Sequence, residues 1–140
     1  MITKFLKRIL RRDPMVKHTQ AHQAGAPKRI PKKSHHIDPH LLSKNAVKVT
    51  QTLQQAGYEA FIVGGAVRDL VLGIEPKDFD VATNATPDQV QRLFRKARLI
   101  GRRFQIVHVT FFGKGHPEII EVSTFRALLD NAGDHVAESG

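Results

Sequence analysis

The chain has 140 residues, a formal net charge of +9 and no cysteine. This length fits one domain with a single hydrophobic core, and the lack of cysteine excludes a disulfide framework and a thiolate zinc site. No apolar run approaches the roughly 18 residues of a membrane-spanning helix, and residues 1–12 lack the continuous apolar stretch of a secretory signal. We therefore expect a cytoplasmic protein without stable membrane insertion.

The excess positive charge lies at the N-terminus. Residues 1–36 hold six Lys and four Arg against one Asp, whereas residues 37–140 hold equal numbers of cations and carboxylates. Because residues 13–36 contain few large apolar side chains, we expect residues 1–36 to form a basic, mostly disordered tail. Such a tail suggests a polyanionic partner, either nucleic acid or an anionic membrane surface. The alternative is a solvated leader that only keeps the protein soluble.

Residues 37–140 are predicted to form one globular domain. A helix is expected to begin at the N-cap Asp38 and to end at Gly57. Its apolar positions recur at helical spacing: Leu42, Ala46, Val49 and Leu53. A buried strand over residues 60–63 then runs into a Gly-Gly turn, and a short helix covers residues 66–72.

The second half of this domain alternates once more and then becomes strand-rich. A strand is predicted over residues 79–82, followed by a helix that begins at Thr86. The buried stripe of that helix is predicted to contain four apolar residues: Val90, Leu93, Phe94 and Ala97. Three final strands, 98–100, 104–112 and 118–125, can pair as a meander. The predicted fold class is α/β, with helices packed on a small mixed sheet that ends incompletely.

The first chemical motif is the turn in Val63-Gly-Gly-Ala-Val-Arg-Asp69. Gly64 and Gly65 lack Cβ atoms, so the backbone can approach a bulky anion. The start of the next helix offers free N–H groups and a positive dipole end, which favour phosphate. Arg68, one turn further along, can add a charge-assisted fork. A Gly-Gly turn between a strand and a helix is also often purely structural.

The second motif is Asp78-Phe79-Asp80. Residues i and i+2 of a strand share a face, so both carboxylates are predicted to point one way while Phe79 enters the core. Paired carboxylates favour hard divalent cations such as Mg²⁺, and two such ions can clamp the oxygens of a phosphoryl displacement. The alternative is a solvated strand end beside Lys77.

Together the two motifs resemble the signature of the template-independent polymerases that include tRNA CCA-adding enzymes and bacterial poly(A) polymerases. The matching segments are Ile62-Val-Gly-Gly-Ala-Val-Arg-Asp69 and Asp78-Phe-Asp-Val-Ala-Thr-Asn-Ala85. Residues 99–111 and 120–126 are similar to the poly(A) polymerase branch in particular, and the resemblance runs from about residue 30 to residue 129. It implies a polymerase-β-like nucleotidyltransferase head.

The resemblance also implies roles for individual residues. Asp78 and Asp80 are the implied ligands of two Mg²⁺ ions. The implied nucleotide-binding residues are Gly64, Gly65, Arg68 and Asp69, of which Asp69 braces the turn. Glu121 is a candidate third catalytic carboxylate, with a surface glutamate as the alternative.

Four further residues are weaker candidates. Arg102, Arg103 and Arg126 can neutralise triphosphate or RNA, although each also fits an ordinary surface arginine. His108 lies in a predicted strand and fits a packing role.

By resemblance, the function is addition of AMP from ATP to RNA 3′ ends with release of pyrophosphate, and the partners are ATP and RNA. Relatives of this kind continue for several hundred residues, through an Arg-Arg-Asp-Phe-Thr-like motif that this chain lacks. We therefore expect a truncated head domain. Two alternatives stay open, namely CCA addition to tRNA and a catalytically incomplete RNA-binding remnant.

Overall fold

The computed structural model describes residues 27–125, and residues 1–26 and 126–140 lie outside the described part. Most of the predicted tail is therefore not covered. In the part of the tail that is described, helix α3 (Lys32–His35) forms a single turn that the sequence did not predict. The carbonyl of Pro31 accepts hydrogen bonds from the N–H groups of Ser34 (2.8 Å) and His35 (3.2 Å), which closes this turn.

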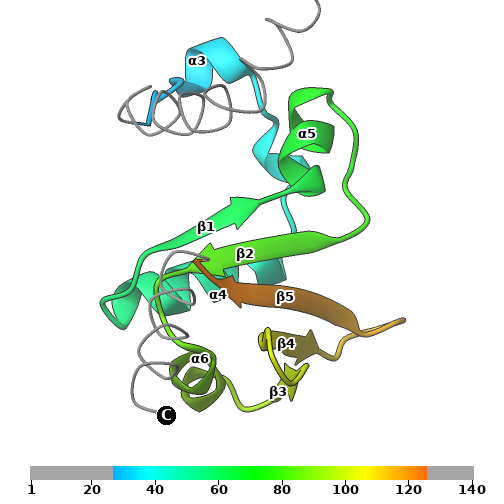
Figure 1. Ribbon diagram of the computed structural model, residues 1–140. Helices are drawn as coiled ribbons and strands as arrows, with labels where there is room; N and C mark the ends of the chain where they lie inside the picture. The colour runs from blue at the N-terminus through cyan, green and yellow to red at the C-terminus, as the bar shows by residue number, and fades with distance from the viewer. Residues whose placement is uncertain (1–26, 126–140) are drawn as a thin grey trace, which may run out of the picture. The chain divides into compact units, whose positions relative to one another are not determined.

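The unit that begins at residue 36 is a mixed α/β domain. Its elements in chain order are η1 (Pro39–Leu41), α4 (Lys44–Gln55), β1 (Ala60–Val63), α5 (Gly65–Val71), β2 (Phe79–Thr83), α6 (Pro87–Leu93), β3 (Ala97–Ile100), β4 (Ile106–Phe111) and β5 (Glu118–Thr124). The sheet order is β1-β2-β5-β4-β3 (Figure 1). Strands β2 and β5 are parallel and the other pairs are antiparallel. The predicted meander of the last three strands is confirmed.

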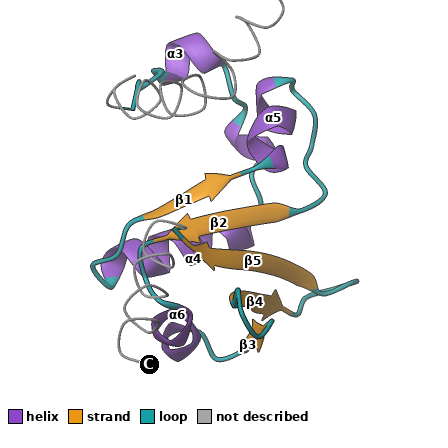
Figure 2. Cartoon of the chain, in the orientation of Figure 1, coloured by secondary structure: helices purple, strands orange, loops and turns teal. Residues whose placement is uncertain are grey.

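One face of the sheet carries the hydrophobic core. Helix α4 packs on β1, β2 and β5, and helix α6 packs on β3, β4 and β5 (Figure 2). Alternate residues of the strands enter this core, as the period of two requires. The fully buried apolar side chains include Val49, Leu53, Val81, Val90, Val107, Ile120 and Val122. We call the other face, on which the intervening strand residues lie, the open face of the sheet.

The segment predicted as one helix from Asp38 to Gly57 forms two helices, η1 and α4. The predicted start at Asp38 is therefore wrong for α4. Asp38 caps only η1, after which the chain is extended at Leu42. Ser43 is the true N-cap of α4, because its Oγ accepts a hydrogen bond from the N–H of Ala46 at 3.2 Å. The same hydroxyl donates to Glu118 at the start of β5. This second contact ties the start of α4 to β5, a strand distant in the sequence.

Helix α6 begins as predicted but ends earlier. Thr86 and Gln89 form a capping box, in which each side chain accepts from the other residue's backbone N–H. The helix stops at Leu93, and Phe94 is already extended. Ala97, predicted on the helical stripe, instead belongs to β3. Its apolar spacing fits either assignment, and pairing with β4 decides between them.

Among the helices of residues 27–125, none has the length and apolar character that crossing a bilayer requires.

The buried hydroxyl of Thr83 joins β2 to its neighbours. It donates to the carbonyl of Glu59 at 2.6 Å and accepts from the N–H of Ala85 at 3.1 Å. Thr83→Val keeps the shape but leaves both backbone groups unpaired, so we expect a loss of about 1–3 kcal/mol in the free energy of unfolding. Thermal denaturation measures it. Thr52→Val is the matched control, because that hydroxyl is exposed on α4. Equal effects would contradict the role of Thr83.

Candidate active site

The turn between β1 and α5 requires glycine at its first position. Gly64 has φ 76° and ψ −151°, a backbone conformation that is accessible essentially to glycine alone. A Cβ atom at Gly64 would also lie 3.1 Å from Oδ2 of Asp80. The turn therefore packs the backbone of Gly64 directly against the Asp80 carboxylate. Of the two glycines, Gly64 is the one whose conformation and surroundings require a residue without a side chain.

The space beside Gly65 is limited by a side chain of its own helix. It is the first residue of α5, and a Cβ atom there would lie 3.2 Å from Nη2 of Arg68. The guanidinium group thus lies close over the start of the helix. A flexible side chain can move away, so this contact restricts Arg68 more than it restricts the backbone.

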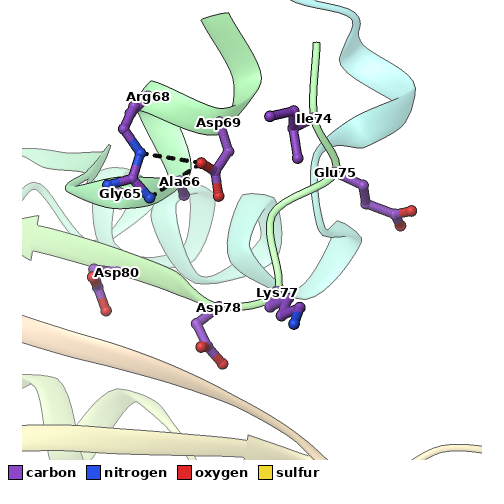
Figure 3. A pocket seen from close by; sticks show the side chains of 9 residues that line it. All are labelled: Gly65, Ala66, Arg68, Asp69, Ile74, Glu75, Lys77, Asp78 and Asp80. Carbon is purple, nitrogen blue, oxygen red and sulfur yellow. Dashed lines mark hydrogen bonds and ion pairs between the residues drawn. The ribbon is translucent and has the colours of Figure 1, made fainter. Parts of the chain in front are cut away.

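The two aspartates lie at the start of β2. Asp80 pairs with Val63, the last residue of β1, so the carboxylate and the glycine turn come from neighbouring strands. Asp78 immediately precedes the strand, and Phe79 between them is buried. Both carboxylates project from the same side of the chain (Figure 3).

These elements line a cavity of about 410 Å³. Its lining residues are Gly65, Ala66, Arg68, Asp69, Ile74, Glu75, Lys77, Asp78 and Asp80. The lining holds four carboxylates against two cations, which favours a bound cation. The loop between α5 and β2 contributes Ile74, Glu75 and Lys77, which belong to neither sequence motif. In the sequence, only their position in the loop that connects the two motifs could have indicated that they line the cavity.

Arg68 and Asp69 form an ion pair at the edge of the cavity. Nε and Nη2 of Arg68 each lie 3.2 Å from Oδ1 of Asp69 (Figure 3). The Arg68 side chain is 72% exposed and that of Asp69 is 24% exposed. Asp69 therefore holds a guanidinium group whose remaining N–H donors are accessible to an anion.

Glu121 lies beside this site but does not line the cavity. It is in register with Asp80 across the β2–β5 pair, so both side chains belong to the open face of the sheet. On its other side, Oε2 of Glu121 lies 3.5 Å from Nε2 of His108. In the part of the chain that the structure describes, no cluster of three or more His, Asp or Glu side chains is placed to hold one metal ion.

The remaining sequence candidates lie elsewhere. Arg102 and Arg103 are exposed in the loop between β3 and β4 and do not line the cavity. The guanidinium carbon of Arg103 lies 5.7 Å from the centre of the Phe104 ring. Arg126 is outside the described residues.

A glycine turn that faces a carboxylate pair on the neighbouring strand of a small mixed sheet defines a nucleotidyltransferase head. Comparison with known proteins agrees. Residues 60–139 match the family model described as the poly(A) polymerase head domain. The chain belongs to this family.

The relatives are longer than this chain. Poly(A) polymerase I of Salmonella typhi is 52% identical over 128 residues, covering 89% of this chain and 26% of the relative. The CCA-adding enzyme of Geobacillus sp. (strain WCH70) is 49% identical over 83 residues, covering 59% and 20%. The crystal structure of Bacillus stearothermophilus CCA-adding enzyme in complex with CTP gives a TM-score of 0.53 at 40% identity, covering 64% of this chain and 21% of that one. The chain thus spans about a quarter of the curated poly(A) polymerase.

The contact between Gly64 and Asp80 yields a stability prediction. Gly64→Ala is expected to lower the free energy of unfolding by about 1–3 kcal/mol from backbone strain, with a further loss from the contact with the carboxylate. Gly57→Ala is the matched control, since Gly57 also has a positive φ (94°) but has no atom within 4 Å of a Cβ position. Chemical denaturation measures both variants. If Gly57→Ala destabilises the protein as much as Gly64→Ala, the contact with Asp80 adds nothing to the cost of a side chain at position 64.

Proposed function

We propose that the protein is the head of an RNA adenylyltransferase that transfers AMP from ATP to RNA 3′ ends and releases pyrophosphate. The observation that carries this proposal is the cavity shared by the glycine turn and the aspartate pair. The 52% identity to a relative named poly(A) polymerase I supports adenylate as the transferred group. In this proposal residues 37–140 belong to the head, residues 1–36 form a basic tail, and the reaction takes place in the cytoplasm.

Asp78 and Asp80 would hold Mg²⁺. Carboxylate oxygens are the ligands that this ion prefers, the cavity has excess negative charge, and the absent side chain of Gly64 leaves Oδ2 of Asp80 accessible. Bound Mg²⁺ would supply charge neutralisation at the phosphates and activation of the attacking hydroxyl.

The chain itself binds and orients the nucleotide. Gly65 leaves room for a phosphate at the start of α5, where the first N–H groups of a helix have no partner within it. Arg68 offers a charge-assisted fork to the same phosphates, and Asp69 keeps it in place. In the transfer, the RNA 3′ hydroxyl releases its proton to solvent and its oxygen forms a bond to the α-phosphorus. The bond from that phosphorus to the α–β bridging oxygen breaks, and pyrophosphate leaves with that electron pair.

CCA addition is the second candidate. The 49% identity to a CCA-adding enzyme and the structural likeness to one in complex with CTP favour it. Competition between labelled ATP and CTP distinguishes the two activities. We expect the natural polypeptide that contains this chain to incorporate AMP repeatedly, whereas ordered incorporation of CMP before AMP on tRNA would favour CCA addition. Binding of RNA without incorporation of either nucleotide would favour a catalytically incomplete remnant.

The aspartates provide the main test. In that polypeptide, Asp78→Ala and Asp80→Ala are each expected to reduce AMP incorporation about a thousandfold or more, because each removes a carboxylate from the metal site. Radiolabelled incorporation measures the rates, and circular dichroism checks the fold. Asp88→Ala is the control, since this exposed carboxylate lies in the first turn of α6. Near-normal incorporation by either cavity variant would refute the assignment.

Arg68 provides a test of nucleotide binding. Arg68→Ala is expected to weaken ATP binding about tenfold or more, because it removes a charge-assisted fork from the phosphates. Titration calorimetry with ATP and Mg²⁺ measures the affinity. Arg92→Ala removes an exposed arginine of α6 outside the cavity and is expected to have no effect. Unchanged affinity of the Arg68 variant would locate the phosphate site elsewhere.

A further inference from the structure

The charge of the domain is strongly divided along the chain. Residues 36–88 hold four Lys and Arg against seven Asp and Glu, whereas residues 89–117 hold seven Lys and Arg and no carboxylate. These seven cations are Arg92, Arg95, Lys96, Arg98, Arg102, Arg103 and Lys114. All seven are exposed, and none is in an ion pair with another described residue. A domain that is close to neutral as a whole thus has one basic region.

Strand pairing connects this region to the aspartate pair. Asp80 is in register with Glu121, Glu121 with His108, and His108 with Arg98. The side chains of this row all belong to the open face, because the residues next to them in β2, β4 and β5 are buried in the core. Three inter-strand spacings of about 4.8 Å place the Arg98 backbone about 14 Å from that of Asp80.

Lys96 extends the same face beyond Arg98. It lies two residues before Arg98, and its carbonyl accepts a hydrogen bond from the N–H of Thr110 at 2.9 Å, which continues the β3–β4 ladder. Its ammonium group lies 4.3 Å from the centre of the Phe112 ring, and Phe112 is 66% exposed. A cation and an aromatic face are therefore presented together.

A second such pair lies at the other end of β3 and β4. Arg103 lies 5.7 Å from the ring of Phe104, which is 62% exposed. We call the set Lys96, Arg98, Arg103, Phe104 and Phe112 the basic edge. Arg98 lies in β3, the strand of the described sheet furthest from β1, Lys96 immediately precedes β3, and the other three residues flank β4.

We propose that the basic edge binds the single-stranded RNA that lies upstream of the reacting 3′ end. The proposal rests on the proposed function, since it needs an RNA terminus at Asp80. Cations that track phosphates, interleaved with exposed aromatic rings on which bases stack, are the features that bind single strands without sequence preference. A few nucleotides would cover the distance from Asp80 to Arg98. Between Asp80 and Arg98 the RNA would pass Glu121 and His108, whose side chains contact each other.

Edge protection and lipid binding are two different roles that a basic strand can have. Charged side chains on an edge strand prevent association with another sheet, and a basic surface attracts anionic lipids. Edge protection does not require exposed phenylalanine rings beside the cations, whereas such rings can enter the headgroup region of an anionic membrane. Neither role predicts that binding of RNA depends on these residues, so RNA binding separates them from the proposal.

The experiment measures binding of fluorescent oligoadenylate to the 140-residue chain at several salt concentrations, without ATP. Lys96→Ala/Arg98→Ala is expected to weaken binding and to flatten the slope of log K against log salt by about 1.4, since a single strand loses about 0.7 per phosphate contact. Phe112→Ala is expected to weaken binding severalfold with an unchanged slope, because stacking releases no counterions. Lys48→Ala/Arg92→Ala is the matched control, which removes two cations from the helices that cover the core face.

The outcomes separate this proposal from the proposed function. An unchanged salt slope for Lys96→Ala/Arg98→Ala, or an equal change in the control, overturns the basic edge whatever the result with ATP. Self-association of that variant with unchanged RNA affinity identifies edge protection instead, and loss of binding only to phosphatidylserine vesicles identifies a lipid surface. Calorimetry with ATP and Mg²⁺ is expected to be unchanged by the variant. Loss of ATP binding together with RNA binding would show that these residues belong to the nucleotide site, which also overturns the proposal.

Discussion

The antiparallel pairing of Val63 with Asp80 creates the site. It sets the last residue of β1 opposite the carboxylate-bearing residue of β2, so the backbone that turns into α5 must pass directly against that carboxylate. Only a residue without a side chain fits there, both because of its backbone conformation and because of the space that Asp80 leaves. The glycine and the aspartate are thus two parts of one packing contact, and the glycine turn cannot shift without moving the carboxylate.

Much of this arrangement follows from the sequence. The Gly-Gly turn and the Asp-x-Asp pair are local patterns, and alternation within β2 is enough to orient Phe79 inward. The start of α4 was harder to predict because Asp38 and Ser43 are both N-cap residue types. Asp38 caps η1, whereas Ser43 caps α4 by accepting from the N–H of Ala46 and also donates to Glu118, far along the chain. Ala97 was misassigned because its spacing fits a helix as well as a strand, and pairing with β4 is a tertiary choice.

The lining of the cavity shows a different limit. Ile74, Glu75 and Lys77 carry no recognisable pattern, and they reach the site because the chain must return from the end of α5 to the start of β2. The basic edge did have a signal, namely the absence of any carboxylate from residue 89 to residue 117. A count over residues 37–140 conceals it, since the net negative charges of residues 37–88 and of residues 118–140 together balance those cations. Charge becomes informative here only when it is assigned to strands.

The parallel pairing of β2 with β5 has a consequence for synthesis of the protein. Every other pair of neighbours in the sheet is consecutive along the chain, but the two members of this pair are separated by α6, β3 and β4. As the chain leaves the ribosome, β1, α5 and β2 are complete long before β5. During that interval β2 is an unprotected edge that can pair with other chains. A nascent chain that stalls before residue 118 would carry both site motifs but would leave this edge of β2 unpaired, so the aspartate pair depends on a strand that contributes no residue to the cavity lining.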